Sequence, residues 1–245
     1  MEENEDKSNI KLFSSLFFPI VFVVVIWLVK LTEITFDVSF GQYGIFPRKF
    51  EGLIGVLFYP LIHNDFNHLI SNSTALFLLS VGIFHFYRPV AYKIYFWTYV
   101  MSGIWIWLSA RESFHIGASG LIYGFATFIF ISGIIRQNTR LLALSMLVIF
   151  LYGGMVWGIF PIKPGMSFEG HLWGSVAGII LAFYYRKIGP QKRKYSWDLE
   201  EELEASMEIE EADIISKQVE IEQGPAEPLQ NQPSIKYVYK EKEDD

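Results

Sequence analysis

Apolar runs of membrane-spanning length recur along the first 188 residues, and short polar turns separate them. A helix needs about 20 apolar residues to cross a bilayer, and helices satisfy their own backbone hydrogen bonds there. Charged residues, glycines and prolines bound six such runs, at about 16–29, 66–86, 92–108, 119–135, 141–160 and 169–185. The sequence therefore predicts an all-α membrane protein, a bundle of six transmembrane helices.

Composition agrees with this prediction and excludes several classes of site. The chain is 51% hydrophobic with a mean hydropathy of +0.28, which is too apolar for a soluble domain of 245 residues. Cysteine is absent, so disulfides, thiolate catalysis and cysteine metal sites are excluded. No basic patch interleaved with aromatic residues indicates nucleic-acid binding.

Charge divides the chain into parts of opposite sign. The net charge of −6 combines about +6 for residues 1–195 with −12 for residues 196–245. We therefore expect an N-terminal segment (1–14), a six-helix domain (15–188) and an acidic tail (189–245). Such a composition favours a disordered tail, which could recruit a cytosolic partner. A short amphipathic helix over Trp197–Ile215 is the alternative, because apolar residues recur there every four positions.

Basic residues predict the orientation in the membrane. Six spans place both termini on one side, and that side has eleven lysines and arginines near the span ends against five opposite. Basic residues stay inside, so both termini are expected in the cytoplasm, with the plasma (inner) membrane as the site. A signal peptide is the alternative for residues 16–29, but no small-residue cleavage site follows them. The long connection 33–65 is expected to form short pieces at the membrane surface.

A serine stands where the fourth predicted helix begins. Gly117 and Gly120 flank Ser119 and leave space around its hydroxyl. The first N–H groups of a helix have no internal partner and could hold the oxyanion of a tetrahedral intermediate. The alternative is that Gly117, Gly120 and Gly124 only allow close packing of two membrane helices.

Other polar residues share the predicted depth of Ser119. The second, fourth and sixth helices run in the same direction, so their first residues, including His68, Asn72 and His171, lie in one leaflet. Each alone could be a satisfied interface residue or a hydrogen bond between helices. Together, polar groups converging in a bilayer indicate function. His85 and His115 are expected at a surface or an interface.

Spacing predicts that these residues meet. His68 and Asn72 lie four apart, on one helix face. Small faces at Gly120 and Gly124, and at Gly174 and Gly178, would let the fourth and sixth helices pack closely and bring His171 within hydrogen-bond reach of Ser119.

The chain resembles the rhomboid family of intramembrane serine proteases over about residues 10–188. The matching motifs are Gly117-Ala118-Ser119-Gly120, His68-x-x-x-Asn72 with His63 before it, and His171-x-x-Gly174-x-x-x-Gly178. Inactive relatives lack the serine or the histidine, and this chain keeps both.

The resemblance implies a role for each of these residues. Ser119 would be the nucleophile and His171 the general base, with Tyr123 stacked on the imidazole. Asn72, His68 and the Ser119 backbone N–H would form the oxyanion hole, with His63, Gly117 and Gly120 in support. The connection 33–65 would be the first loop and 161–168 a mobile cap. No cofactor or metal is implied, and the substrates would be membrane proteins within the lipid bilayer.

The chain departs from the family pattern at two places. Gly170 precedes His171 where the family commonly has alanine. The Trp-Arg pair often found in the first loop is absent, and Gly44-Ile45-Phe46-Pro47-Arg48 stands there instead.

The sequence fits other functions less well. The closest alternative is a catalytically silent rhomboid-like protein that binds or escorts membrane proteins. A transporter would need ionisable residues near the midplane, and the run interiors are nearly free of them. The chain has no His-Glu-x-x-His motif and no membrane-embedded aspartate pair, so metallo- and aspartyl intramembrane proteases are excluded.

Overall fold

The computed structural model describes residues 2–151, 156–161, 167–191 and 196–223, and all regular structure in them is helical. The chain divides into two compact units, Met1–Arg193 and Lys194–Asp245, and each is described by itself.

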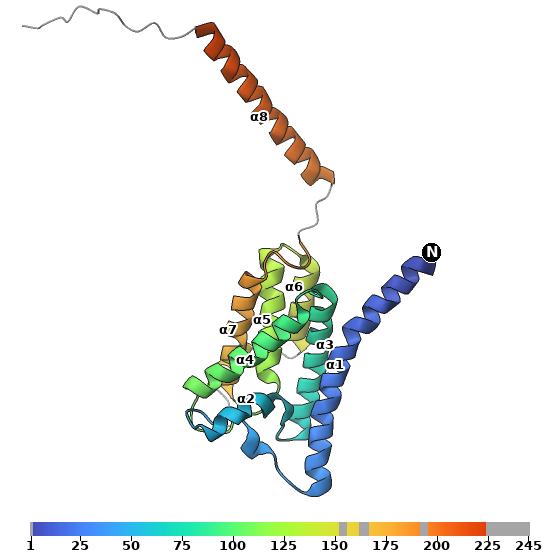
Figure 1. Cartoon of the computed structure of the whole chain (residues 1–245), viewed down its shortest axis with the longest axis vertical. Coiled ribbons are helices and arrows are strands. Elements are labelled where there is room, and N and C mark those ends of the chain that lie inside the picture. Colours follow the sequence, from blue (N-terminus) through green and yellow to red (C-terminus); the bar gives the residue numbers. More distant parts are fainter. Residues whose placement is uncertain (1, 152–155, 162–166, 192–195, 224–245) are drawn as a thin grey trace, which may run out of the picture. The chain divides into compact units, whose positions relative to one another are not determined.

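Six long helices of the first unit occupy the places of the six predicted runs (Figure 1). They are α1 (Glu2–Phe36), α3 (Phe66–Phe86), α4 (Ala91–Ser109), α5 (Ser119–Ile135), α6 (Thr139–Leu151) and α7 (Phe168–Tyr184). Two of these helices, Phe13–Phe36 within α1 and Phe66–Phe86, are long and apolar enough by themselves to cross a membrane, among the residues described. Ser119–Ile135 is a shorter apolar helix.

Two predicted boundaries are wrong. The first helix extends well beyond residues 16–29 in both directions, since nothing in its flanks stops a helix once it has formed. The fifth ends at Leu151 rather than 160, and the described chain resumes in the 3-10 helix η4 (Val156–Ile159). Within the predicted cap 161–168, residues 162–166 lie outside the described residues.

The connection 33–65 consists of short pieces, as predicted. After α1 it forms η1 (Gly41–Tyr43), η2 (Glu51–Ile54), α2 (Gly55–Phe58) and η3 (Tyr59–Leu61). One isolated backbone bridge, between Ile45 and His115, ties this connection to the segment before α5.

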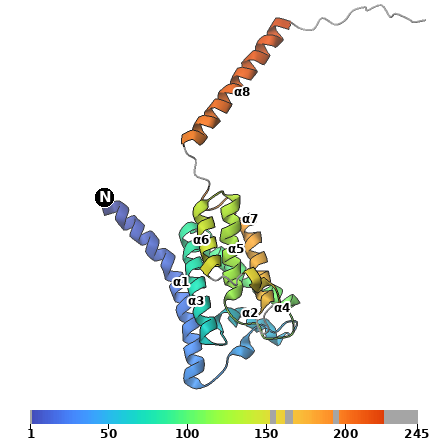
Figure 2. The ribbon, with the colours of Figure 1, turned by 180° about the vertical axis from the view of Figure 1, so that it is seen from behind.

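α5 is the central helix of the first unit, and its most extensive contact is with α7 (Figures 1 and 2). A Cβ on Gly174 would collide with the carbonyl oxygen of Gly120, and one on Gly178 with that of Gly124. The predicted glycine faces therefore do meet, backbone against backbone. Thr127 Oγ1 also donates to the carbonyl of Ser175 at 3.1 Å.

The remaining helices enclose this pair. α1 packs along α3, where Trp27 Nε1 donates to Ser73 Oγ at 3.0 Å. Interior apolar residues of α3 and α5, such as Leu79 and Phe125, are fully buried, whereas the outward faces of α1 and α7 expose large apolar side chains. Apolar residues on both the inside and the outside are typical of a bundle whose solvent is lipid.

A buried arginine caps the far end of α7. The Arg136 guanidinium donates to the carbonyls of Tyr185, Ile188 and Pro190 at 2.6, 2.7 and 3.3 Å. Its central carbon also lies 4.9 Å from the centre of the Tyr87 ring. These donors hold the chain directly beyond Tyr184, the last residue of α7.

The prediction of a disordered tail is wrong over part of its length. Residues Ser196–Gln223 form a single helix, α8, longer than the alternative interpretation allowed. The segment is rich in glutamate, which is a strong helix former, and Lys217 pairs with Asp213 one turn away at 2.7 Å. Residues 224–245 lie outside the described residues.

Candidate active site

Ser119 and His171 lie in direct contact. His171 Nε2 is 2.8 Å from Ser119 Oγ, although the residues are 52 positions apart. Ser119 is the first residue of α5, and His171 lies in the first turn of α7. The glycine contact between these helices brings their first turns together, as the spacing predicted. His171 is only 6% exposed, while Ser119 is half-buried.

The second nitrogen of His171 fixes the tautomer of the ring. Nδ1 lies 2.8 Å from the carbonyl oxygen of Gly158, and because a carbonyl only accepts, Nδ1 carries the proton. Nε2 is then an acceptor facing the Ser119 hydroxyl. Gly158 lies in η4, and no sequence motif indicates this contact, because the acceptor is a backbone oxygen, which every residue has.

Tyr123 holds the imidazole from its face. The ring planes of Tyr123 and His171 are 6° apart, with centroids separated by 4.1 Å. Tyr123 lies one turn after Ser119 on α5. The stacking that the resemblance implied is therefore present, and it limits rotation of the imidazole.

His68 and Asn72 of α3 lie against Gly117, two residues before Ser119. A Cβ on Gly117 would come within 2.9 Å of His68 Nε2 and 3.5 Å of Asn72 Nδ2. Gly117 has φ +103°, a conformation that favours glycine, and its N–H donates to the Tyr59 carbonyl at 2.7 Å. Both side chains thus border the loop that leads into the serine.

His63 links α3 to the loop before α5 by hydrogen bonds. Asn72 Nδ2 lies 3.1 Å from His63 Nε2, and the Ala118 N–H donates to the same nitrogen at 3.4 Å. Two donors on Nε2 require that it be unprotonated. Burial, followed by the nearby His68, lowers the pKa of His63 to about 3, so the neutral ring is favoured. An asparagine amide has two N–H donors, and His63 occupies one of them.

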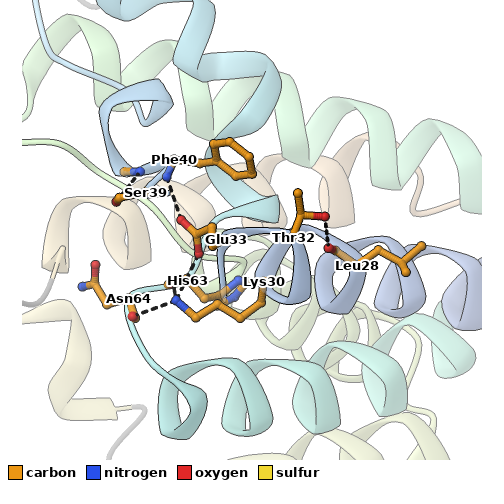
Figure 3. A network of polar contacts seen from close by, with 9 residues as sticks. Leu28, Lys30, Thr32, Glu33, Ser39, Phe40, His63 and Asn64 are labelled. Atoms are coloured by element: carbon orange, nitrogen blue, oxygen red, sulfur yellow. Dashed lines mark hydrogen bonds and ion pairs between the residues drawn. The ribbon is translucent and has the colours of Figure 1, made fainter. Parts of the chain in front are cut away.

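Lys30 anchors the turn that carries His63 (Figure 3). Its ammonium group donates to the carbonyls of His63 and Asn64 at 2.9 and 3.0 Å and pairs with Glu33 at 3.0 Å. The other Glu33 oxygen accepts from the Phe40 N–H at 2.7 Å. Sequence reasoning placed Lys30 only at the end of the first span and missed this role.

Arg48 fastens the connection where the Trp-Arg pair is absent. Its Nη1 donates to the Ala110 carbonyl at 2.8 Å, and its backbone N–H donates to the Trp107 carbonyl. Its guanidinium also lies 3.6 Å from the Glu112 carboxylate. The connection is therefore tied to the end of α4 by a different residue.

The two remaining histidines differ. His85 is exposed, as expected. His115 is 2% exposed and hydrogen-bonded on both ring nitrogens, so it belongs to an internal interface and not to a surface. Among the described residues, no three His, Asp or Glu side chains gather in a way that could hold a metal ion.

A family model of the rhomboid domain matches residues 51–188, which is more than half of the chain and contains every residue named above in contact with Ser119 or His171. The chain belongs to the rhomboid family. It is thus an integral membrane protein of a family of intramembrane proteases.

Uncharacterised proteins of mycobacteria are similar to this rhomboid. Proteins of Mycobacterium bovis and Mycobacterium tuberculosis are each 32% identical over 178 residues, covering 67% of this chain and 72% of the relative. One of Mycobacterium leprae is 29% identical over 174 residues, covering 67% of this chain and 68% of the relative. These similarities extend beyond the matched domain.

Proposed function

We propose that this rhomboid is an intramembrane serine endopeptidase that cleaves transmembrane segments of membrane proteins near the outer leaflet. The observation that carries the proposal is the hydrogen bond between His171 Nε2 and Ser119 Oγ. In it, a weak nucleophile faces the free lone pair of a base whose other nitrogen is already occupied.

Acylation begins when the Ser119 oxygen attacks the scissile carbonyl carbon while His171 Nε2 accepts the hydroxyl proton. The carbonyl oxygen becomes an oxyanion, which the Ser119 N–H, the second Asn72 amide hydrogen and His68 would stabilise. When this intermediate collapses, the C–N bond breaks and His171 returns the proton to the leaving amine.

Deacylation repeats these steps with water. His171 accepts a proton from a water molecule, the hydroxide attacks the acyl carbon, and the proton passes to the Ser119 oxygen as it leaves. The half-buried position of Ser119 supports entry of this water. Apart from this water, the proposed steps use only groups of the protein.

The same proposal includes a membrane arrangement. The six helices α1, α3, α4, α5, α6 and α7 would each span the bilayer, with both termini in the cytoplasm and the plasma (inner) membrane as the location. The excess of basic residues at one set of span ends supports this orientation. The start of α5 would then lie below the outer surface.

Labelling with a fluorophosphonate fluorophore tests the proposal, because only an activated serine reacts at a useful rate. We expect the purified protein to be labelled on Ser119 and to cleave a transmembrane substrate. Ser119→Ala and His171→Ala should each lower cleavage by at least about 10³-fold. Mass spectrometry of the products would locate the cut.

The matched control is Ser175→Ala, which removes a different hydroxyl on α7 that donates to the His171 carbonyl. This variant should keep most of the activity. Undiminished cleavage by Ser119→Ala or His171→Ala would contradict the proposal. A folded wild-type protein that neither labels nor cleaves would favour the silent binding or escort protein.

A further inference from the structure

A second histidine–serine pair lies beside Ser119 and His171. His115 Nδ1 is 2.6 Å from Ser167 Oγ. His115 precedes Ser119 by four residues, and Ser167 precedes His171 by four. The pair therefore joins the two segments that lead into the proposed nucleophile and base.

The hydrogen-bond directions in this pair follow from its neighbours. His115 Nε2 lies 3.0 Å from the Arg111 carbonyl, which only accepts, so Nε2 carries the proton and Nδ1 accepts from the Ser167 hydroxyl. Ser167 Oγ in turn accepts from the Gly170 N–H at 3.3 Å and caps the start of α7. One continuous chain of hydrogen bonds thus runs from α7 to the loop before α5.

The loop end of this chain is itself held in place. The backbone of His115 pairs with that of Ile45 through two hydrogen bonds of 2.9 and 3.0 Å. Arg111 lies 3.6 Å from Glu169, in the first turn of α7. Burial lowers the pKa of His115, which agrees with a neutral ring that accepts at Nδ1. His115 is therefore a fixed point from which Ser167 is positioned.

We infer that His115 is a positioning residue: through Ser167 it sets the start of α7, and with it the place of His171 relative to Ser119. The inference rests on the proposed function of that pair. His115 acts through Ser167 and is not a catalytic residue. A base displaced by about 1 Å can cost about 10²-fold in rate, so the bond should affect kcat more than KM.

Two substitutions separate the two bonds of the ring. In His115→Asn the amide oxygen takes the place of Nδ1 and can accept from Ser167, whereas the donor to Arg111 is lost. In His115→Gln the amide nitrogen takes the place of Nε2 and can donate to Arg111, whereas the acceptor for Ser167 is lost. Each variant is therefore the control for the other.

The experiment measures the rate of fluorophosphonate labelling, kcat and KM for a transmembrane substrate, and the melting temperature of the full-length protein in detergent. We expect His115→Asn to stay within about threefold of wild type. His115→Gln should lower labelling and kcat by about 10- to 100-fold with little change in KM. Ser167→Ala removes both the bond to His115 and the cap on the Gly170 N–H. It should therefore lower both rates less in the His115→Gln background than in the wild type, because the bond between the two residues can be lost only once.

A His115→Gln variant as active as wild type would overturn the inference. So would equal losses in both variants that follow their melting temperatures, because the histidine would then only stabilise the fold. In either case the wild-type protein is labelled, so the proposed function stands. An unlabelled wild type would overturn both.

Discussion

Both ring nitrogens of His171 have a partner within the protein. The Gly158 carbonyl fixes the proton on Nδ1, and Nε2 faces the Ser119 hydroxyl. In a triad this orientation is supplied by a carboxylate. Here a backbone oxygen and a stacked tyrosine hold the ring instead, so the proposed dyad would need no acid.

The Tyr123 ring should matter more than its hydroxyl. Tyr123→Ala removes the stacked face, and aromatic pairs contribute about 0.5–1.5 kcal/mol, so we expect kcat to fall roughly 2- to 10-fold. Tyr123→Phe keeps the ring and should retain near wild-type kcat. Steady-state cleavage of one substrate by both variants measures this. Equal losses of kcat in the two variants would show that the Tyr123 hydroxyl, and not its ring, contributes to kcat.

His63 should make stability depend on pH. Its pKa is about 3 in the folded protein and near 6.5 when unfolded, so only the unfolded state gains a proton between these values. Above pH 6.5 the neutral ring makes its full contribution to the free energy of unfolding. This contribution falls by at most about 1.4 kcal/mol per pH unit below that, until the pH reaches the folded pKa.

Thermal unfolding in detergent at pH 7.5 and pH 4.5 measures this effect. His63→Gln is the reference, because its amide oxygen can accept from Asn72 and Ala118 but does not titrate. The wild type should lose more melting temperature on acidification than this variant. An equal loss in both proteins would mean that His63 is already charged when folded.

At the scale of elements, the contact between α5 and α7 makes the site. It was predictable, because Gly120, Gly124, Gly174 and Gly178 repeat at helical spacing and mark two small faces. Contacts made by backbone atoms could not be predicted from the sequence. They include the contact of the Gly158 carbonyl with His171 and the carbonyls that bind Lys30. A sequence distinguishes positions by their side chains. Because every residue has a backbone carbonyl, the sequence does not indicate which carbonyl accepts a given hydrogen bond.

Gly178→Ala should disturb the site from a distance. The added methyl would meet the Gly124 carbonyl, a backbone atom that cannot swing aside. Overpacking of this kind costs about 1–3 kcal/mol, so we expect a lower melting temperature and slower labelling of Ser119. Gly41→Ala is the control, since its methyl would find only Ser39 Oγ at 3.5 Å. Equal melting temperatures for the two variants would show that the helices can part without cost.

At the scale of the whole molecule, the chain has a membrane unit and an acidic one. Apolar runs of the sequence mark the places of six helices, and the bounds of the fourth agree with the structure, whereas those of the first and fifth do not. The structure of the tail was harder to predict from the sequence. Low hydrophobicity argues against a folded core but not against a single helix. Its many glutamates, together with the pair of Asp213 and Lys217 one turn apart, favour helix.

Removal of residues 194–245 should leave the chemistry unchanged. The first unit contains the whole site and its own buried core, so Ser119 labelling and kcat should remain within about twofold of the full chain. Labelling of purified truncated and full-length protein at equal concentration measures this. A large loss would assign the tail a part in folding or activity.

The helix that carries His171 is fastened at both ends, by Ser167 at its start and by Arg136 beyond its finish. Because these contacts hold His171 in place, the substrate polypeptide would have to change its conformation to bring a peptide bond to the proposed base. A segment that uncoils readily near the cut, through glycine or proline, should then be processed faster than one that binds equally well but stays coiled.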